Sequence, residues 1–197
     1  MNKVLEIISK KRGYDGFFKI DCIEFKHSLF QGGMTPIISR ELFGRGQAVV
    51  VLLYDTATQQ VVLVEQCRAG ALMHAYENPN NAWLLEPVAG MIDHGEKPYD
   101  ACVRECQEEA SIQVLEFEPI YQFYPSPGGS DEVLHLFAAE IDAQLVPDYA
   151  GLAEDHEDIR LVKLSFSEAK QRLMAAEFNV ASTLIGLQWL FFQKLAV

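Results

Sequence analysis

Several features typical of membrane, secreted and nucleic-acid-binding proteins are missing from this sequence of 197 residues. Its longest apolar run, Ala48 to Tyr54, is far shorter than the roughly 20 residues that a membrane-spanning helix needs. The first 16 residues lack the apolar core of a signal peptide, so we expect a cytoplasmic protein with no membrane contact. Lysine and arginine form no cluster and the formal net charge is −12, which argues against binding to nucleic-acid phosphates.

Cysteine is also scarce, and its four positions, Cys22, Cys67, Cys102 and Cys106, form no CxxC pair and no zinc pattern. Cys102 and Cys106 stand four residues apart on an expected helix. They could be half of a metal site, or two small apolar side chains on a buried face. The apolar neighbours on that side favour the buried face.

Apolar residues, in contrast, make up 49% of the sequence, which is enough to build a sizeable core. Period-two patterns and turn signals predict strands over residues 17–28, 35–43, 48–54, 61–66, 83–88, 112–124, 133–142 and 159–164. Helical spacing and a capping box predict helices over 97–110, 165–177 and 181–195. Residues 1–16 are amphipathic but poorly defined as an element. We therefore expect an α+β fold, with an N-terminal β appendage (residues 1–44) and a main domain (residues 45–197).

The helix expected over residues 97–110 carries three carboxylates on one face, because Glu105, Glu108 and Glu109 stand at i, i+3 and i+4. A solvated acidic surface is the usual meaning of such a cluster. A cation site is favoured by the preceding loop with Gly90 and by the adjacent Arg104. Hard cations such as Mg²⁺ bind carboxylate and carbonyl oxygens, and a bound cation would offset the repulsion between this acidic chain and a phosphorylated ligand.

Residues 90–112, GMIDHGEKPYDACVRECQEEASI, resemble the Nudix box. The residues in register with that motif are Gly90, Glu96, Arg104, Glu105, Glu108, Glu109 and Ile112. Cys106 replaces an aliphatic residue of the motif, and Ser111 replaces its final glycine. A helix end often adopts left-handed geometry, which costs serine more than glycine, so we expect a small loss of stability or a slightly different cap, and no loss of chemistry.

The resemblance extends from about residue 25 over nearly the whole chain, towards the bacterial ADP-ribose pyrophosphatases of the family. Pro127, sixteen residues after Ser111, stands where a proline marks that group. Other matching segments are Arg40-Glu41, Glu65-Gln66 with Arg68, and residues 85–90, 151–153, 157–160 and 187–190.

This resemblance implies a Nudix α/β/α sandwich of mixed sheets with an antiparallel N-terminal β appendage that joins two subunits as a homodimer and completes the site. It implies Mg²⁺-dependent hydrolysis of ADP-ribose to AMP and ribose 5-phosphate, with Mn²⁺ as a possible substitute. One alternative is a pyrophosphatase for other nucleoside diphosphate sugars, such as GDP-mannose. Another is a binding module without catalysis, which is disfavoured because all box carboxylates are present.

The resemblance also implies roles for individual residues. Metal ligands would be Glu105, Glu109, Glu157 and the carbonyl of Ala89. Catalysis would involve Glu108, Arg104 and Asp155, with Arg104 paired to Glu108 or Glu96. Substrate would be bound by Arg40, Glu41, Arg68, Ser126, Pro127, Gly128, Gly129 and Glu132.

Plainer interpretations of these segments remain open. Arg40 and Arg68 could be surface arginines, residues 126–129 a simple turn, and residues 154–158 a solvated acidic loop. Asp155 stands at the position of the family's general base but is one methylene shorter than the usual Glu, and Glu154 lies beside it.

Overall fold

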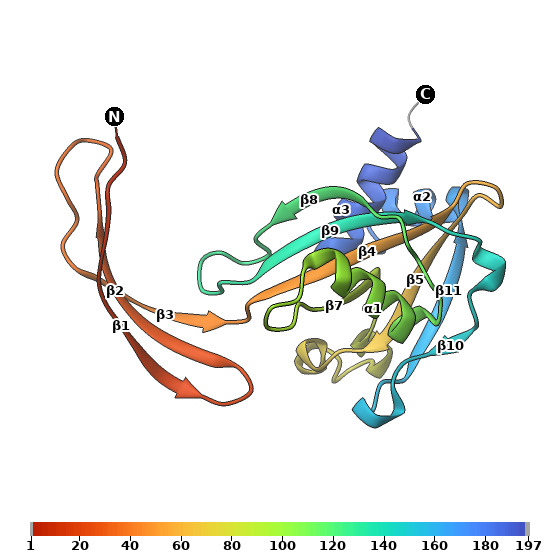
Figure 1. Ribbon diagram of the computed structural model, residues 1–197, viewed down its shortest axis with the longest axis horizontal. Helices are drawn as coiled ribbons and strands as arrows, with labels where there is room; N and C mark the ends of the chain where they lie inside the picture. The colour runs from red at the N-terminus through yellow and green to blue at the C-terminus, as the bar shows by residue number, and fades with distance from the viewer. Residues whose placement is uncertain (1, 196–197) are drawn as a thin grey trace. The chain divides into compact units, whose positions relative to one another are not determined.

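The computed structural model describes residues 2–195 and divides into two compact units. The first unit comprises the chain up to residue 47 together with residues 124–133, and the second comprises residues 48–123 and the chain from 134 onward. The first unit contains an antiparallel sheet of three strands in the order β1 (Leu5–Asp15), β2 (Lys19–His27) and β3 (Ile38–Gly44) (Figure 1).

Strand β1 covers residues that are poorly defined as an element in the sequence. Its pairing with β2 has irregularities between Ile7 and Ser9 and between Arg12 and Tyr14, which interrupt the alternation of side chains. Every residue of β1 except Ser9 is exposed, so no apolar face is selected by burial. Both properties remove the period-two signal by which a strand is recognised.

The second unit is built on an eight-stranded sheet. Its main path runs β10-β11-β5-β4-β9-β8, while β6 pairs with β5 and β7 pairs with β4. The strands are β4 (Gln47–Asp55), β5 (Gln60–Cys67), β6 (Trp83–Glu86), β7 (Val88–Met91), β8 (Glu118–Phe123), β9 (Val133–Glu140), β10 (Tyr149–Ala150) and β11 (Ile159–Ser165).

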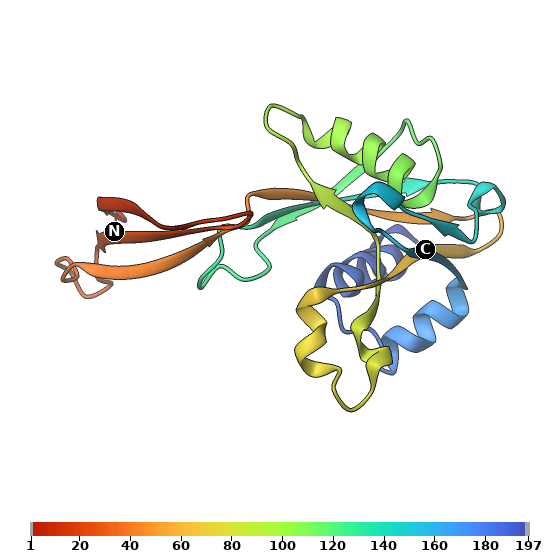
Figure 2. The ribbon, with the colours of Figure 1, turned by 90° about the horizontal axis from the view of Figure 1, so that it is seen from below.

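Helices cover both faces of this sheet. Helix α1 (Pro98–Ala110) lies on one face, and α2 (Phe166–Met174) and α3 (Ala181–Trp189) lie on the other (Figure 2). Helix α3 continues into a short π-helical segment, η5 (Leu190–Lys194). Short 3₁₀ turns occupy the connections, namely η1 (Ala69–His74), η2 (Pro79–Ala82), η3 (Ala143–Leu145) and η4 (Ala153–Asp155). The predicted α/β/α sandwich with mixed sheets is confirmed.

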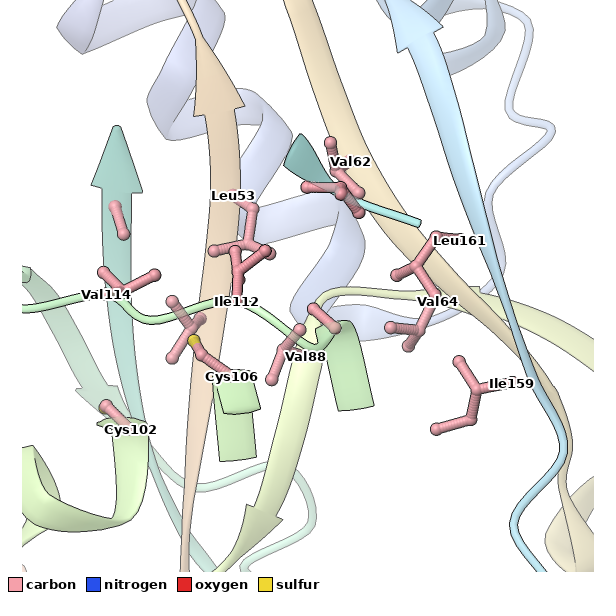
Figure 3. Close-up of a cluster of buried hydrophobic side chains, with 14 of the residues drawn as sticks. Leu53, Val62, Val64, Val88, Cys102, Cys106, Ile112, Val114, Ile159 and Leu161 are labelled. Carbon is pink, nitrogen blue, oxygen red and sulfur yellow. The ribbon is translucent and has the colours of Figure 1, made fainter. Parts of the chain in front are cut away.

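Strand β5 shows how the sheet supports two hydrophobic cores. Val62 and Val64 belong to the core beneath α1 (Figure 3), whereas Val61 and Leu63 belong to the core beneath α2 and α3. Successive side chains of a strand point to opposite faces, so a continuous apolar run fills both layers. Cys102 and Cys106 are fully buried in the α1 core, which confirms their interpretation as small apolar side chains.

Two predicted strands differ from those observed. The segment expected over 83–88 is two short strands, because Pro87 has no N–H to donate and the chain changes partner there from β5 to β4. The segment expected over 112–124 forms a strand only from Glu118. Ile112 and Val114 are buried in the core without belonging to a strand, so their alternation reflects packing rather than sheet pairing. Among residues 2–195, no helix has the length and apolar character needed to cross a membrane.

Candidate active site

Helix α1 places the three predicted carboxylates at the edge of its core. Pro98 occupies the first turn, where a missing N–H costs little, and Ser111 ends the helix with φ 54° and ψ 31°. The left-handed geometry expected at this position is therefore confirmed. Cys102 and Cys106 fix which side of the helix faces the sheet, so Glu105 and Glu109 lie at the border of the buried stripe.

Replacing Ser111 with glycine is expected to stabilise the protein by about 1 kcal/mol, because glycine adopts left-handed geometry without the steric cost that a Cβ brings. The Ser111 side chain is exposed, so little packing is lost. Urea unfolding of the two proteins would measure the difference. An unchanged or lower midpoint for Ser111→Gly would show that the serine is not strained at this cap.

Arg104 forms ion pairs with three carboxylates at this face of the helix. Its Nη1 lies 2.5 Å from Glu105 Oε1 and 3.0 Å from Glu108 Oε2. Its Nε lies 3.0 Å from Glu96 Oε1, and its Nη2 donates to the Met91 carbonyl at 2.9 Å. Both pairings expected for Arg104 are present, and the guanidinium holds the pKa of Glu96 below its usual range. Arg104 thus orients the carboxylates and ties them to β7.

Glu109 is the most deeply buried of the three, with 3% of its surface exposed. Its Oε2 accepts a hydrogen bond from the Ala89 N–H at 2.9 Å. Burial raises the pKa of Glu109 to about 8; the Ala89 bond and the charge of Arg68 oppose the rise, and Glu105 and Glu157 add to it. Burial also raises the pKa of Glu105, against the effect of Arg104. A bound cation would relieve the cost of charging these two side chains.

Gly90 explains why β7 and α1 approach so closely. A Cβ at this position would lie 1.8 Å from Oε1 of Glu105, so no side chain fits while Glu105 keeps its place. Gly90 pairs with Val49 of β4, which holds the backbone of β7 against the helix. The Ala89 N–H is thereby held beside Glu109.

The acidic loop after β10 is anchored to α1. The N–H of Gly151 donates to the Glu108 carbonyl at 3.2 Å, and the Glu157 N–H donates to the Leu152 carbonyl at 3.0 Å. Glu157 lies near enough to influence the pKa values of both Glu105 and Glu109. Asp155 is in η4, and its side chain is exposed, as is that of Glu154. The structure therefore gathers Ala89, Glu105, Glu108, Glu109 and Glu157, with Asp155 on the same loop as Glu157.

The residues fit a hard divalent cation by their chemistry. They offer carboxylate and carbonyl oxygens, which Mg²⁺ and Mn²⁺ prefer. In the described part of the chain, no group of three His, Cys, Asp or Glu side chains already converges as a metal site. In their present positions Glu105 is turned to Arg104, and Glu109 accepts from the Ala89 N–H.

Arg68 adds a positive charge to this face. It follows β5 and forms an ion pair with Glu86, with Nε and Oε2 2.5 Å apart. Sequence reasoning gave no role to Glu86, although it lies in the matching segment 85–90. Its position opposite Val64 in the β5–β6 pairing is what brings it to Arg68, and that pairing is not visible in a sequence.

The other predicted substrate residues belong to the first unit. Arg40 and Glu41 are exposed on β3. Residues 126–129 form a turn in which the Gly129 N–H faces the Ser126 carbonyl at 3.4 Å. The Gly129 carbonyl accepts from the Phe43 N–H at 2.7 Å, so this turn is bound to the end of β3.

Glu132 has a partner that sequence reasoning missed. Its Oε1 lies 3.1 Å from Nη2 of Arg45, whose guanidinium carbon is 4.8 Å from the ring centroid of Phe18. Arg45 stands between Gly44 and Gly46. An arginine between two glycines was the available signal, since glycines let other groups approach the backbone closely.

Comparison with known proteins identifies the family of this chain. The model of the NUDIX domain matches residues 44–182, and the chain belongs to the Nudix family. It is 42% identical to the ADP-ribose pyrophosphatase of Haemophilus influenzae over 186 residues, and these residues are 94% of this chain and 85% of that protein. The ADP-ribose pyrophosphatase of Escherichia coli (strain K12) is 40% identical over 186 residues, or 94% of this chain and 87% of that protein.

A GDP-mannose pyrophosphatase of Escherichia coli (strain K12 / DH10B) is 30% identical over 191 residues, which are 96% of each chain. The resemblance predicted from residues 90–112 is therefore confirmed at the level of the family.

Proposed function

We propose that this protein is a metal-dependent pyrophosphohydrolase that cleaves ADP-ribose to AMP and ribose 5-phosphate. The observation that carries the proposal is the buried carboxylate pair Glu105 and Glu109, held by Arg104 and the β7 backbone. The substrate is supported by the two relatives named ADP-ribose pyrophosphatase, at 42% and 40% identity, against 30% for the GDP-mannose pyrophosphatase.

We assign the metal to Glu105, Glu109, Glu157 and the carbonyl of Ala89, with Mg²⁺ as the expected ion and Mn²⁺ as a substitute. These ligands would hold a divalent ion, which would supply positive charge to the pyrophosphate and would activate a water for attack at phosphorus. Glu108 and Arg104 keep the other carboxylates in place. The net charge of −12 makes this positive charge necessary for binding a pyrophosphate.

We assign the proton-accepting role to Asp155. Its loop is fixed at Gly151 to the Glu108 carbonyl and at Glu157 to Leu152, so the loop ends are held while η4 between them is exposed. A base must come within about 3 Å of its proton, directly or through one water. Glu154 is the neighbouring candidate, and comparing Asp155→Asn with Glu154→Gln would separate the two.

We assign substrate binding to Arg68 and, in the first unit, to Arg40, Glu41, Ser126, Pro127, Gly128, Gly129 and Glu132. We propose a domain boundary near residue 44. A homodimer joined through residues 1–44 is supported by exposed apolar side chains there. Leu5, Ile7 and Phe30 are 67%, 65% and 91% exposed, and apolar surface of this kind is typical of an interface. Sedimentation of the purified chain would test the dimer. We place the protein in the cytoplasm.

The test of the function is a hydrolysis screen with Mg²⁺ and with Mn²⁺. ADP-ribose, GDP-mannose, UDP-glucose, NADH and diadenosine polyphosphates are offered separately, and products are identified by mass. ADP-ribose is expected to give AMP and ribose 5-phosphate with the highest kcat/KM. Preferential cleavage of GDP-mannose would replace the proposed substrate, and binding of ADP-ribose without release of AMP would leave a binding module.

Asp131 offers a test of the turn at residues 126–129. Its Oδ1 accepts from the N–H groups of Arg45 and Gly46 at 2.7 and 3.2 Å, which closes the segment onto the end of β3. Asp131→Ala is expected to raise KM for ADP-ribose by about threefold to tenfold with kcat little changed, because it loosens binding rather than chemistry. Asp131→Asn keeps the acceptor and should be nearly normal. An unchanged KM for Asp131→Ala would separate this turn from substrate binding.

A further inference from the structure

Gln66 carries an oxygen that the chain leaves without a partner. Its Oε1 is the only buried side-chain nitrogen or oxygen among residues 2–195 that has no hydrogen-bond partner. The residue as a whole is only half-buried. An unpaired buried acceptor costs free energy, and most buried polar atoms in folded proteins are paired. We therefore expect the Gln66 Oε1 to accept a hydrogen bond from a donor outside the chain.

The alternation of β5 places Gln66 on the α1 side of the sheet. Val62 and Val64 belong to the core under α1, and Gln66 and Arg68 continue that face. Strand β6, which pairs with this end of β5, leads through Pro87 into β7, where the Ala89 N–H contacts Glu109, so this end of the strand borders the carboxylate face. Opposite Gln66 on β6 stands Leu84, whose side chain has no donor. Gln66 is thus a polar side chain at the end of β5 that lies nearest the carboxylate face, beyond the apolar residues 61–64.

The chemistry of the missing partner is restricted by the atom that is unpaired. A carbonyl-type oxygen needs an N–H or O–H, so ionised phosphate oxygens and carboxylates cannot serve. The groups expected at the proposed site that can donate are a sugar hydroxyl of the substrate and a water coordinated to the metal. Both present an O–H donor.

We propose that Gln66 is a further ligand-binding residue of the active site, whose Oε1 accepts a hydrogen bond from an O–H group that arrives with the substrate or the metal. This inference rests on the proposed function for the nature of its ligands. The segment Glu65-Gln66 was matched to the family by sequence without any role for the glutamine. Its unpaired oxygen supplies that role.

The test is the thermal unfolding of Gln66→Met, which keeps the length of the side chain and removes its polar atoms. The full chain is measured free, with Mg²⁺ alone, with α,β-methylene ADP-ribose alone, and with both. Free Gln66→Met should unfold at the wild-type temperature or above it, because no internal hydrogen bond is lost. The rise in unfolding temperature produced by a ligand should be smaller than in the wild type, by the amount that corresponds to threefold to tenfold weaker binding. The matched control is Gln60→Met, at the other end of β5, which should leave every ligand shift unchanged.

The separate ligands identify the donor. A smaller Mg²⁺ shift assigns it to coordinated water, and a smaller shift with the analogue alone assigns it to a sugar hydroxyl. Ligand shifts equal to those of the wild type overturn the proposal, whether or not the free variant is destabilised. The proposed function is judged separately, by cleavage of ADP-ribose in the wild-type protein, so its failure would be seen without reference to Gln66.

Discussion

Replacing Glu109 with glutamine is expected to lower kcat for ADP-ribose by about 10³-fold or more and, in metal-free protein at pH 8, to raise stability. The loss of activity follows because the amide cannot supply the negative charge that the proposed cation needs, and such a cation contributes several kcal/mol to catalysis. The gain in stability follows because the carboxylate is only 3% exposed. Glutamine Oε1 can still accept from the Ala89 N–H, so the fold should persist.

The pH dependence of this gain has a definite sign. In the metal-free folded protein the pKa of Glu109 is raised to about 8, from an ordinary value of 4.5. The folded state therefore binds more protons than the unfolded state between these values, and stability falls as pH rises through that window. The stability contributed by this group is fully present below about pH 4.5 and lost above about pH 8, and it amounts to at most about 5 kcal/mol. Arg68, Glu105 and Glu157 are the charged groups acting on it, and Glu109→Gln should flatten this slope.

Urea unfolding between pH 5 and 9 in the presence of a chelator, together with steady-state kinetics in Mg²⁺, would measure both effects. Glu116→Gln, at an exposed position of the same unit, is the matched control and should leave both measurements unchanged. Turnover of Glu109→Gln close to that of the wild type would remove Glu109 from the metal site. If metal-free Glu109→Gln is less stable than the wild type at pH 8, the buried carboxylate does not destabilise the folded protein.

Helix α1 could be predicted almost to the residue, because its evidence is local. Apolar spacing, a proline in the first turn and the carboxylates at i, i+3 and i+4 all lie within one segment, and Arg104 could reach its partners on the same helix or in the adjoining loop. The face that they form was therefore visible before any tertiary structure. The same holds for the cap of α2, where Ser165 Oγ accepts from the Glu168 N–H at 3.1 Å.

Features that depend on pairing between distant segments could not be predicted. Arg68 meets Glu86 because β5 and β6 are neighbours in the sheet, and Arg45 meets Glu132 across 87 residues of sequence. The raised pKa of Glu109 has the same origin, since its main cause is burial in the folded protein. Strand β1 is a different case, because exposure and bulges removed the periodicity that would have shown it. The carboxylate face can therefore be predicted from the sequence, whereas the electrostatics of that face depend on tertiary structure.

Replacing Gly90 with alanine is expected to lower kcat/KM by about 10²-fold or more, with a smaller loss of stability of about 1–3 kcal/mol. The new Cβ would lie 1.8 Å from Oε1 and 1.9 Å from Cδ of Glu105. The end of a side chain can move, whereas the β7 backbone is paired to Val49. Glu105 must therefore leave its place and its 2.5 Å contact with Arg104. The substitution displaces a proposed metal ligand while leaving its carboxylate in the protein.

Kinetics over a range of Mg²⁺ concentrations would detect this displacement as a higher metal requirement as well as a lower rate. Gly70→Ala is the matched control, because a Cβ there meets nothing within 4 Å, and it should behave as the wild type. Adding Glu105→Asp to Gly90→Ala shortens the displaced side chain by one methylene and should restore part of the lost activity. Normal kinetics and an unchanged Mg²⁺ requirement in Gly90→Ala alone would show that Glu105 does not need to occupy its present place beside Gly90. In that case the metal would have to be held by Glu109 and Glu157 without it.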